Sequence, residues 1–324
     1  MTGLDYVAKR VAFAIATVFA AVTLNFVLFR AIPGDAVQAL RCQHCTIQFK
    51  NALRKELGLD KSKWEQYWLY LRDLSHGDLG SSVRSQQSVW SELWPTIKNT
   101  MPMIALGYVF SIVLGTIVGV VAAWRRGTVV DKAGLWTGLG FYSMPPQWLG
   151  LMIVLFVASA IGLPTSGIKD PTLGILGDAS SFDLAVDRLR HMVLPALTIG
   201  LVLFGEYALI VRSAMLETLG EDYVLTARAK GLSSWATVWK HGFRNALLPV
   251  VTLGALSLGY IIGGFITVEY VFSYPGIGLA VVEAIDQRDY PILQGAFLLL
   301  AFAVIIFNLV ADLLYFELDP RVTS

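Results

Sequence analysis

Long apolar runs alternate with shorter polar segments along the chain. Five runs contain no Asp, Glu, Lys or Arg, and they are Val11–Phe29, Met101–Trp124, Ala133–Ile168, Ala246–Val268 and Ile292–Ala311. A sixth run, Met192–Val211, contains one such residue, Glu206. A helix needs about 20 apolar residues to cross the hydrocarbon core of a membrane. The pattern therefore predicts an all-α integral membrane protein with six transmembrane helices.

Composition supports this fold class. Of the 324 residues, 55% are hydrophobic and 15% are charged, whereas a soluble domain carries about 25% charged residues. The formal net charge of +1 gives no reason to expect a nucleic-acid partner. The first apolar run is too long for the apolar core of a signal peptide, and no clear cleavage site follows it. We expect it to be retained as the first span.

Basic residues in the short connecting segments predict the orientation, because cytoplasmic loops are enriched in Lys and Arg. With the N-terminus inside, the inside segments contain Lys9, Arg10, Arg125, Arg126, Lys132, Arg212, Arg228, Lys230, Lys240, Arg244 and Arg321. The short outside loops contain Lys169, Arg188, Arg190 and Arg288. This asymmetry predicts that both termini are cytoplasmic.

A single transmembrane domain is expected over all 324 residues. Residues 1–30 hold the first span, residues 31–99 form a large extracytoplasmic loop, and residues 100–324 form the core region. Apolar spacing and glycine ends predict two short helices in the loop, around residues 49–58 and 64–77. Two interpretations stay open: a structured loop that lies on the membrane surface, or a docking platform for an external partner.

Small residues and prolines mark places where the spans are expected to pack closely or to break. Gly115 and Gly119 lie on one face of the second span, and Gly259 lies in the fifth, so both helices should approach a neighbour closely. Pro145 and Pro146 interrupt the third run, which is too long for one straight helix. A break at membrane depth persists only where protein or a watery cavity satisfies the backbone. These positions are candidates for the pore or its packing.

Glu206 is the one ionisable residue inside the six apolar runs. A carboxylate at the centre of a membrane helix costs roughly 2.5 to 3.5 kcal/mol, so it needs a partner or a wet cavity. One interpretation places Glu206 in the pore. The alternative, which we favour, is a carboxylate that reaches the inner interface or pairs with a basic neighbour such as Arg212. An ion-coupled carrier would usually contain several such groups.

The sequence lacks motifs for enzyme chemistry. No Walker A, H-E-x-x-H or G-x-S-x-G pattern occurs, and the four histidines form no cluster. Cys42 and Cys45 form a C-x-x-C pair in the outside loop, with His44 between them. A zinc site needs more ligands than these, and the outside is oxidising. We therefore predict two free or disulfide-linked thiols, no metal site and no enzymatic activity.

A basic segment with helix caps separates the fourth and fifth spans. Glu221 and Asp222 begin it and Gly231 ends it, which predicts a helix of about two turns with a left-handed glycine cap. Ser233-Ser234 is expected to cap a second helix that begins near Trp235.

The small side chains of Ala227 and Ala229 keep the first helix slim, which would permit close approach by a partner. The alternative is an ordinary basic inside loop that follows the charge rule. That alternative explains the arginines, but it does not explain why caps order both ends of the segment.

Two stretches of this segment carry a family resemblance, "DYVLTARAKGL" (residues 222–232) and "HGFRNALLPVV" (residues 241–251). They resemble the coupling-loop signature of the membrane subunits of binding-protein-dependent ABC importers, and more closely that of dipeptide and oligopeptide permeases. Further matches along nearly the whole chain are "RAIPGD", "LGLDKSKWEQYWLYL", "GDLGSSV", "HMVLPALTIG", "VRSAMLETL", "VEYVFSYPGIG" and "LDPR". Each is weak alone, but together and in this order they are specific. Leu225 stands where the wider family often has Glu, and "RCQHC" is not part of the pattern.

The resemblance implies a type I ABC importer permease fold with a cytoplasmic coupling helix at about residues 221–232. It implies a bacterial plasma membrane location and several partners: a second homologous permease subunit in a heterodimer, two ATP-binding subunits and an extracytoplasmic substrate-binding protein. ATP and Mg²⁺ would bind to the ATPase subunits, with no cofactor on this chain. The residues that the resemblance assigns to ATPase coupling are Tyr223, Thr226, Ala227, Arg228, Ala229, Lys230, Gly231, Leu232, His241, Arg244, Asn245 and Pro249.

Dipeptides or oligopeptides are the expected substrates, and relatives of this type also carry nickel chelates, glutathione or oligosaccharides. A stand-alone secondary transporter is the alternative from another class, and its uptake would follow an ion gradient without an ATPase. A membrane scaffold that transports nothing is a poorer interpretation, because it gives no role to the broken third span.

Overall fold

The structure is a computed structural model that describes residues 3–31, 47–56, 58, 60–173, 180–243, 246, 250, 253, 254, 257 and 265–318. These parts of the chain are helical, apart from turns, loops and one isolated bridge between Ser81 and Ser88. In the first half the helices are α1 (Gly3–Ala31), α3 (Ile47–Glu56), α4 (Lys63–Ser75), α5 (Val89–Trp124), α6 (Val129–Tyr142), α7 (Pro146–Met152), η1 (Ile153–Ala158, a π-helical stretch) and α8 (Ser159–Ile161). In the second half they are α9 (Ser181–Leu219), α10 (Asp222–Ala229), α11 (Ser234–Ala236), η2 (Thr237–Phe243), α13 (Ile266–Val271), α14 (Ile277–Gln287) and α15 (Tyr290–Leu318).

Four described helices are long and apolar enough to cross a membrane: α1, α5, α9 and α15. A fifth candidate is the pair α6 and α7–α8, which is bent by 107° at the break between them. The break falls at Pro145 and Pro146, as the sequence predicts. A proline disfavours the helical conformation of the residue before it, so helix α6 ends ahead of Pro145. Pro146 begins the next helix, where the missing N–H of a proline costs nothing.

The bent pair carries the chain back along the core, because the helices on either side of it, α5 and α9, run parallel. A Cβ built on Gly107 of α5 would lie 3.0 Å from Ile199 Cβ of α9, and one built on Gly119 would lie 2.7 Å from Val211 Cβ. Contacts therefore advance along both helices in the same direction. The chain between α5 and α9 must return to the starting side, and the bent pair is the segment that does so.

Small residues let α5 and α9 pack backbone to backbone. A Cβ on Gly115 would lie 2.5 Å from Tyr207 Cβ and 2.7 Å from the carbonyl oxygen of Phe204. Gly138 of α6 also approaches Gly205 of α9 closely, because a Cβ built on Gly138 would lie 3.0 Å from the Cα atom of Gly205. The close packing predicted for Gly115 and Gly119 is confirmed, and dispersion contacts rather than a hydrophobic driving force hold such helices together in lipid.

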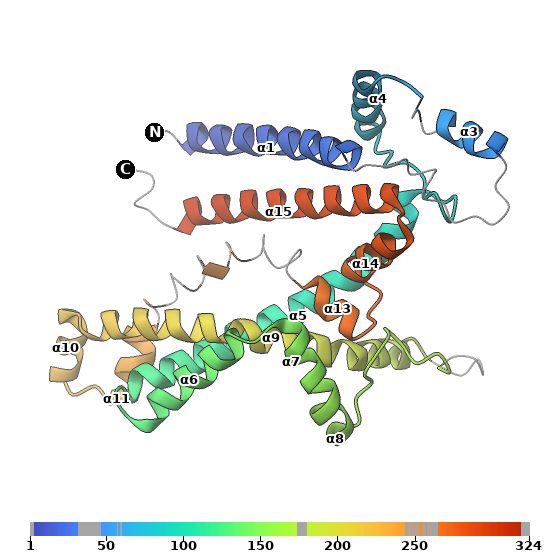
Figure 1. Cartoon of the computed structure of the whole chain (residues 1–324). Coiled ribbons are helices and arrows are strands. Elements are labelled where there is room, and N and C mark those ends of the chain that lie inside the picture. The colour runs from blue at the N-terminus through green and yellow to red at the C-terminus, as the bar shows by residue number, and fades with distance from the viewer. Residues whose placement is uncertain are drawn as a thin grey trace.

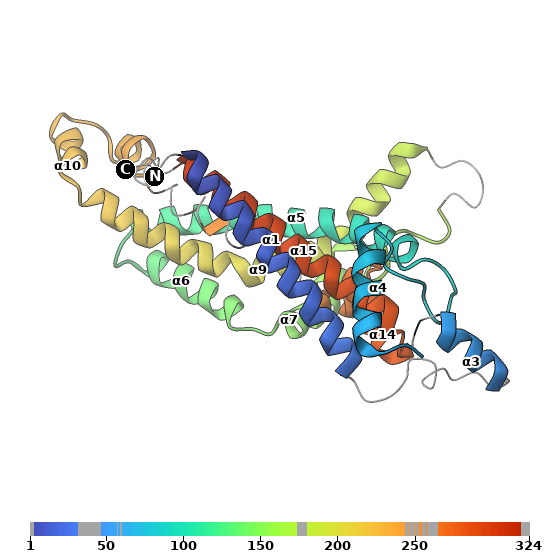
Figure 2. The same cartoon turned by 90° about the horizontal axis from the view of Figure 1, so that it is seen from above.

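The first and last helices form an antiparallel pair beside this core (Figures 1 and 2). Arg10 of α1 forms an ion pair with Asp312 of α15 at 3.1 Å, and Asn25 Nδ2 donates to the carbonyl of Gln294 at 3.3 Å. The start of α1 and the end of α15 thus lie together, at the same end of the molecule as α10 (Figure 1). We call this the α10 end.

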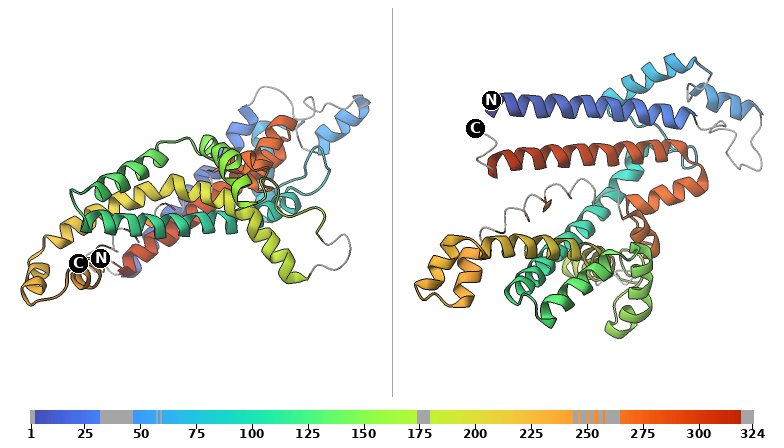
Figure 3. Two further views of the ribbon diagram at one scale, coloured as in Figure 1. Left: turned by 90° about the horizontal axis from the view of Figure 1, so that it is seen from below. Right: turned by 60° about the vertical axis from the view of Figure 1, so that its left-hand side comes forward.

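The opposite end carries α3, α4, α14 and the loop before α5, as the right-hand view of Figure 3 shows. Asp289, between α14 and α15, accepts a hydrogen bond from Ser82 Oγ at 2.5 Å and is close to the backbone N–H groups of Val83 and Arg84, at 3.4 Å each. The loop is therefore fastened to the start of α15. The two helices predicted in the region of residues 31–99 are confirmed as α3 and α4.

Most of the predicted fifth span, Ala246–Val268, lies outside the described residues, and so does Gly259. The number of six spans therefore stays a prediction, with four straight helices and one bent pair in the part that the structure describes. Cys42 and Cys45 also lie outside the described residues.

Candidate coupling segment and membrane polar groups

The segment after α9 folds as the sequence predicts. Helix α10 has eight residues, which is about 12 Å at 1.5 Å per residue. Asp222 lies in its first turn, where a negative charge favours the helix dipole. Gly231 follows with φ of 83°, the left-handed conformation expected of a C-terminal glycine cap, and the N–H of Leu232 bonds to the carbonyl of Ala227 at 3.3 Å.

The two faces of α10 differ in what they contact. Val224 and Ala227 are buried, at 0% and 7% exposure, because the three-residue spacing turns both toward α9 and η2. The exposed positions are Asp222, Tyr223, Thr226 and Ala229, together with Lys230 just after the helix. The expectation that Ala227 lies on the partner-facing side is therefore wrong: Ala229 is on the free face, and Ala227 sets how closely α10 packs on its own chain.

Aromatic rings connect the segment after α10 to the end of a membrane span. Ser233 caps α11 by accepting from the N–H of Ala236 at 3.3 Å. Trp235 of α11 packs on Trp124, the last residue of α5, with ring centroids 5.5 Å apart, and on Trp239 of η2 at 5.3 Å. This tryptophan row, Trp124–Trp235–Trp239, links α5 to the coupling segment at its solvent-facing edge.

The other residues assigned to coupling are only partly described. The backbones of Arg228 and His241 lie in α10 and η2, but their side chains are outside the described part of the structure. Arg244, Asn245 and Pro249 are outside it altogether.

Asp131 and Arg212 form an ion pair that the sequence analysis missed. Arg212 Nε and Nη2 lie 2.6 and 2.9 Å from the two carboxylate oxygens of Asp131, and Asp131 also accepts from the N–H of Gly127 at 2.9 Å. Asp131 is 2% exposed. The pair joins α6 to α9 at the α10 end. A signal was present, since Arg212 directly follows one apolar run, Asp131 lies two residues before another, and the charge pattern places both on the same side.

Glu206 does not pair with Arg212, whose guanidinium is held by Asp131. Six residues correspond to about 240° around a helix with 3.6 residues per turn, so the two side chains leave α9 on different faces. Glu206 is half-buried, and no hydrogen bond or ion pair to it is found among the described residues.

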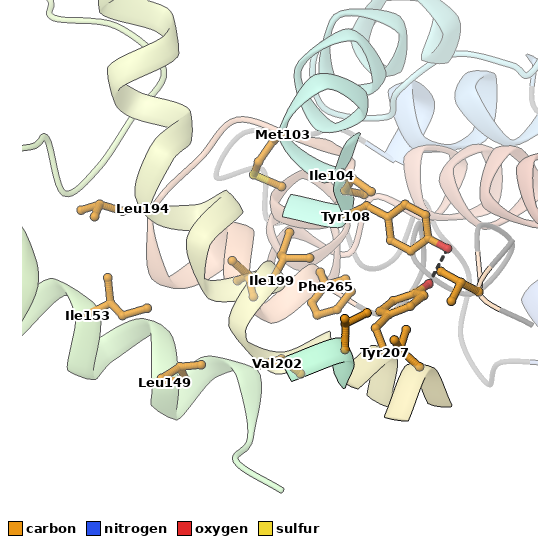
Figure 4. Close-up of a cluster of buried hydrophobic side chains, with 14 of the residues drawn as sticks. Met103, Ile104, Tyr108, Leu149, Ile153, Leu194, Ile199, Val202, Tyr207 and Phe265 are labelled. Atoms are coloured by element: carbon orange, nitrogen blue, oxygen red, sulfur yellow. Dashed lines mark hydrogen bonds between the residues drawn. The ribbon is translucent and has the colours of Figure 1, made fainter. Parts of the chain in front are cut away.

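Next to Glu206, two tyrosines form a polar chain inside the apolar core. The hydroxyl of Tyr207 donates to that of Tyr108 at 2.7 Å (Figure 4). The Tyr108 hydroxyl in turn donates to the carbonyl of Gly254. Gly254 belongs to the predicted fifth span. These hydrogen bonds therefore join α5 and α9 to that span. They also give the two tyrosine hydroxyls, which would be costly to bury unpaired, a hydrogen-bond partner each.

The break in the third span lies against α13. Thr267 Oγ1 is 3.4 Å from Gln147 Oε1, and a Cβ on Gly150 would lie 3.2 Å from the ring of Phe272. Pro145 and Pro146 thus bend the chain just before it meets α13, where Leu149 and Gly150 are buried, while Pro145 itself is exposed.

Glu269 is a second buried carboxylate that the sequence analysis missed. It is 2% exposed and accepts from Thr100 Oγ1 at 2.5 Å and from the N–H groups of Gly278 and Leu279 at 2.7 and 3.1 Å. It therefore caps α14 and joins that helix to α5. Its position directly after an apolar run, before a Pro-Gly turn, is the signal that could have identified it.

Long apolar helices, a bent helix pair and a short capped helix at one end fit a polytopic membrane protein. Residues 115–324 match the family model "Binding-protein-dependent transport system inner membrane component", and residues 3–104 match the model of the N-terminal part of such membrane components. The chain belongs to this family, and it is a permease component of a binding-protein-dependent ABC transporter.

Relatives cover nearly the whole chain. It is 37% identical over 337 residues to the dipeptide transport system permease protein DppB of Escherichia coli (strain K12), with 98% of each chain covered. It is 37% identical over 334 residues to the di/tripeptide transport system permease protein DppB of Pseudomonas aeruginosa (strain UCBPP-PA14), again with 98% of each covered. It is 33% identical over 320 residues to the glutathione transport system permease protein GsiC of Escherichia coli (strain K12), with 98% and 99% covered.

Proposed function

We propose that this chain forms one half of the membrane pore of an ABC importer for di- or oligopeptides. A second, homologous permease subunit supplies the other half, two ATP-binding subunits lie on the cytoplasmic side, and an extracytoplasmic binding protein delivers the substrate. The observation that carries the proposal is α10. It is fixed to its own chain through Val224 and Ala227 while it leaves Tyr223, Thr226 and Ala229 exposed at the end of the molecule.

In this mechanism, α10 docks in a groove on an ATPase subunit. Closure of the ATPases on ATP draws the two α10 helices of the heterodimer together. The tryptophan row passes this movement to α5, and the packing of η2 on Met215 and Leu219 passes it to α9. Because α5 and α9 pack as one unit, they move together and open the pore to the outside. This is alternating access, in which ATP shifts the population between two states.

The α10 end is assigned to the cytoplasm of a bacterial cell. The basic residues of the short loops favour this orientation, which also places both termini inside. The chain itself acts as a pore subunit and not as an enzyme, with ATP and Mg²⁺ bound by the partner subunits.

Peptides are the preferred substrates because the relatives named above are permeases for dipeptides, di/tripeptides and glutathione, all of which contain peptide bonds. Nickel chelates and oligosaccharides are the alternative substrates. Within the loop of residues 31–99, the part before α5 that is fastened through Ser82 and Asp289 is the surface that we assign to the binding protein.

The test is uptake of a labelled dipeptide by proteoliposomes that contain the complete complex and the binding protein. The proposal expects uptake that requires ATP inside the vesicles and persists when ion gradients are collapsed. Uptake by this chain alone, driven by an ion gradient and independent of ATP, would instead establish a secondary transporter. ATP-driven uptake of an oligosaccharide or nickel chelate but no peptide would overturn the substrate assignment alone.

A further inference from the structure

Helix α4 crosses the end of α1 that lies opposite the α10 end (Figures 1 and 2). The hydroxyl of Tyr67 is 2.8 Å from Thr23 Oγ1, and the ring of Phe26 packs on Tyr67 and Tyr70 with centroids 5.2 and 5.6 Å apart. A capping box between Ser62 and Glu65 fixes the start of α4. The hydrogen bonds that Ser62 donates also lower the pKa of Glu65. The helix is therefore a fixed element and not a loose part of the loop.

The contact with Thr23 sets the depth of α4 in the membrane. The apolar run Val11–Phe29 is about 28 Å long as a helix, which matches the hydrocarbon core of about 30 Å. Thr23 precedes Phe29 by six residues, so it lies about 9 Å inside the apolar part of the span. A tyrosine that reaches Thr23 holds α4 beside the end of the span, at the level of the membrane interface.

Two large indole side chains on α4 are exposed at this level. Trp64 and Trp68 are 66% and 55% exposed, and their rings are 5.8 Å apart. The ring of Trp64 also stacks on that of Tyr67, with centroids 5.9 Å apart. The depth of Tyr67 in the membrane therefore fixes the depth of Trp64 and Trp68. Phe19 and Val27 lie four residues before and after Thr23, on the same face of α1, and both are exposed, at 59% and 51%.

We propose that α4 is an interfacial helix whose Trp64 and Trp68 lie in the headgroup region of the outer leaflet. Indole rings favour this region because their apolar body and polar N–H suit its two sides. The tryptophans continue the exposed apolar surface of α1, so the bilayer that surrounds α1 is their neighbour. The helix would hold the first span at a fixed height and give the loop of residues 31–99 a constant level above the membrane.

The test uses nitroxide spin labels on single cysteines in the complete complex, reconstituted in phosphatidylcholine–phosphatidylglycerol vesicles. Cys42 and Cys45 are first replaced by Ser. Labels are placed at Trp64→Cys and Trp68→Cys, with Phe19→Cys as the deep reference and Gln87→Cys, on an exposed loop, as the aqueous reference. Collision rates with oxygen, which concentrates in lipid, and with a water-soluble nickel chelate give the depth of each label.

Labels at positions 64 and 68 are expected to lie between the two references, with an oxygen-to-nickel ratio several-fold above that of Gln87→Cys. The values should not change when the binding protein is added. A ratio equal to that of Gln87→Cys would overturn the proposal, since the helix would then lie in water. Low collision rates with both reagents, or a fall on adding the binding protein, would also overturn it, because protein and not lipid would then cover this face.

Discussion

The indole N–H of Trp124 donates a hydrogen bond to Ser234 Oγ at 3.0 Å. Trp124 is the last residue of α5, and Ser234 is the first residue of α11, just after α10. A membrane span and the proposed coupling segment are thus joined directly and not only through the chain. Removal of this link is expected to weaken the transmission of movement from α10 to α5, while the fold of α5 itself persists.

Close packing between α5 and α9 leads to a first prediction. Gly115→Ala places a methyl group against Tyr207 Cβ and a backbone carbonyl, so the helices must separate at a cost of about 2 kcal/mol. The melting temperature of the purified complex should fall by about 5 °C. Gly140→Ala is the matched control, because no atom lies within 4 Å of its added Cβ. Equal melting temperatures for both variants would contradict the packing.

The ion pair at the α10 end gives a second prediction. Asp131→Asn leaves the Arg212 guanidinium without its charged partner at a buried site, which costs about 3 kcal/mol. Thermal denaturation should show a clear loss of stability. Asp131→Asn combined with Arg212→Gln removes both charges and should restore part of the loss. If the double variant is as unstable as the sum of the two single variants, the pair is not coupled.

The glycines and prolines were the most predictable features, since their effects are local. Gly115 and Gly119 identified the packing face, Pro145 and Pro146 identified the break, and Gly231 identified the helix end. Each of these depends on the backbone of one residue and on the neighbouring sequence.

Long-range pairings could not be predicted in the same way. Asp131 finds Arg212, and Glu269 finds Thr100, only after distant helices pack together. The position of Ala227 was wrong for a related reason: composition shows that α10 is slim, but only the contacts with α9 and η2 show which side is free.

Orientation provides a third prediction. Gln87 and Arg126 are both exposed, and they lie at opposite ends of α5. Single cysteines at these positions should react differently with an impermeant thiol reagent in intact cells, with labelling of Gln87→Cys and none of Arg126→Cys until the membrane is opened. The reverse pattern would place α10 outside and remove it from any cytoplasmic ATPase.

The left-handed conformation of Gly231 is the basis of a fourth prediction. No atom lies within 4 Å of a Cβ added there, so a substitution acts through the backbone alone. Gly231→Val should cost about 1 kcal/mol or more, whereas Gly231→Asn is better tolerated because Asn adopts this conformation more readily. Peptide uptake should fall about fivefold for the Val variant and much less for Asn. Equal uptake would show that the end of α10 carries no coupling.

The exposed face of α10 carries the central claim, and Ala229 is its most direct test. Ala229→Glu adds bulk and charge on the free face, so the purified permease pair should keep its melting temperature. In the reconstituted complex, ATP-driven peptide uptake should fall more than about tenfold, which corresponds to a loss of about 1.4 kcal/mol in docking.

Ala229→Ser should keep uptake near the wild-type level. Ala227→Glu, on the buried face, should instead lower the melting temperature. The deciding measurement is uptake together with co-purification of the ATPase subunits for Ala229→Glu. Loss of either one in a stably folded variant is the predicted result, and full uptake with normal assembly would contradict the account.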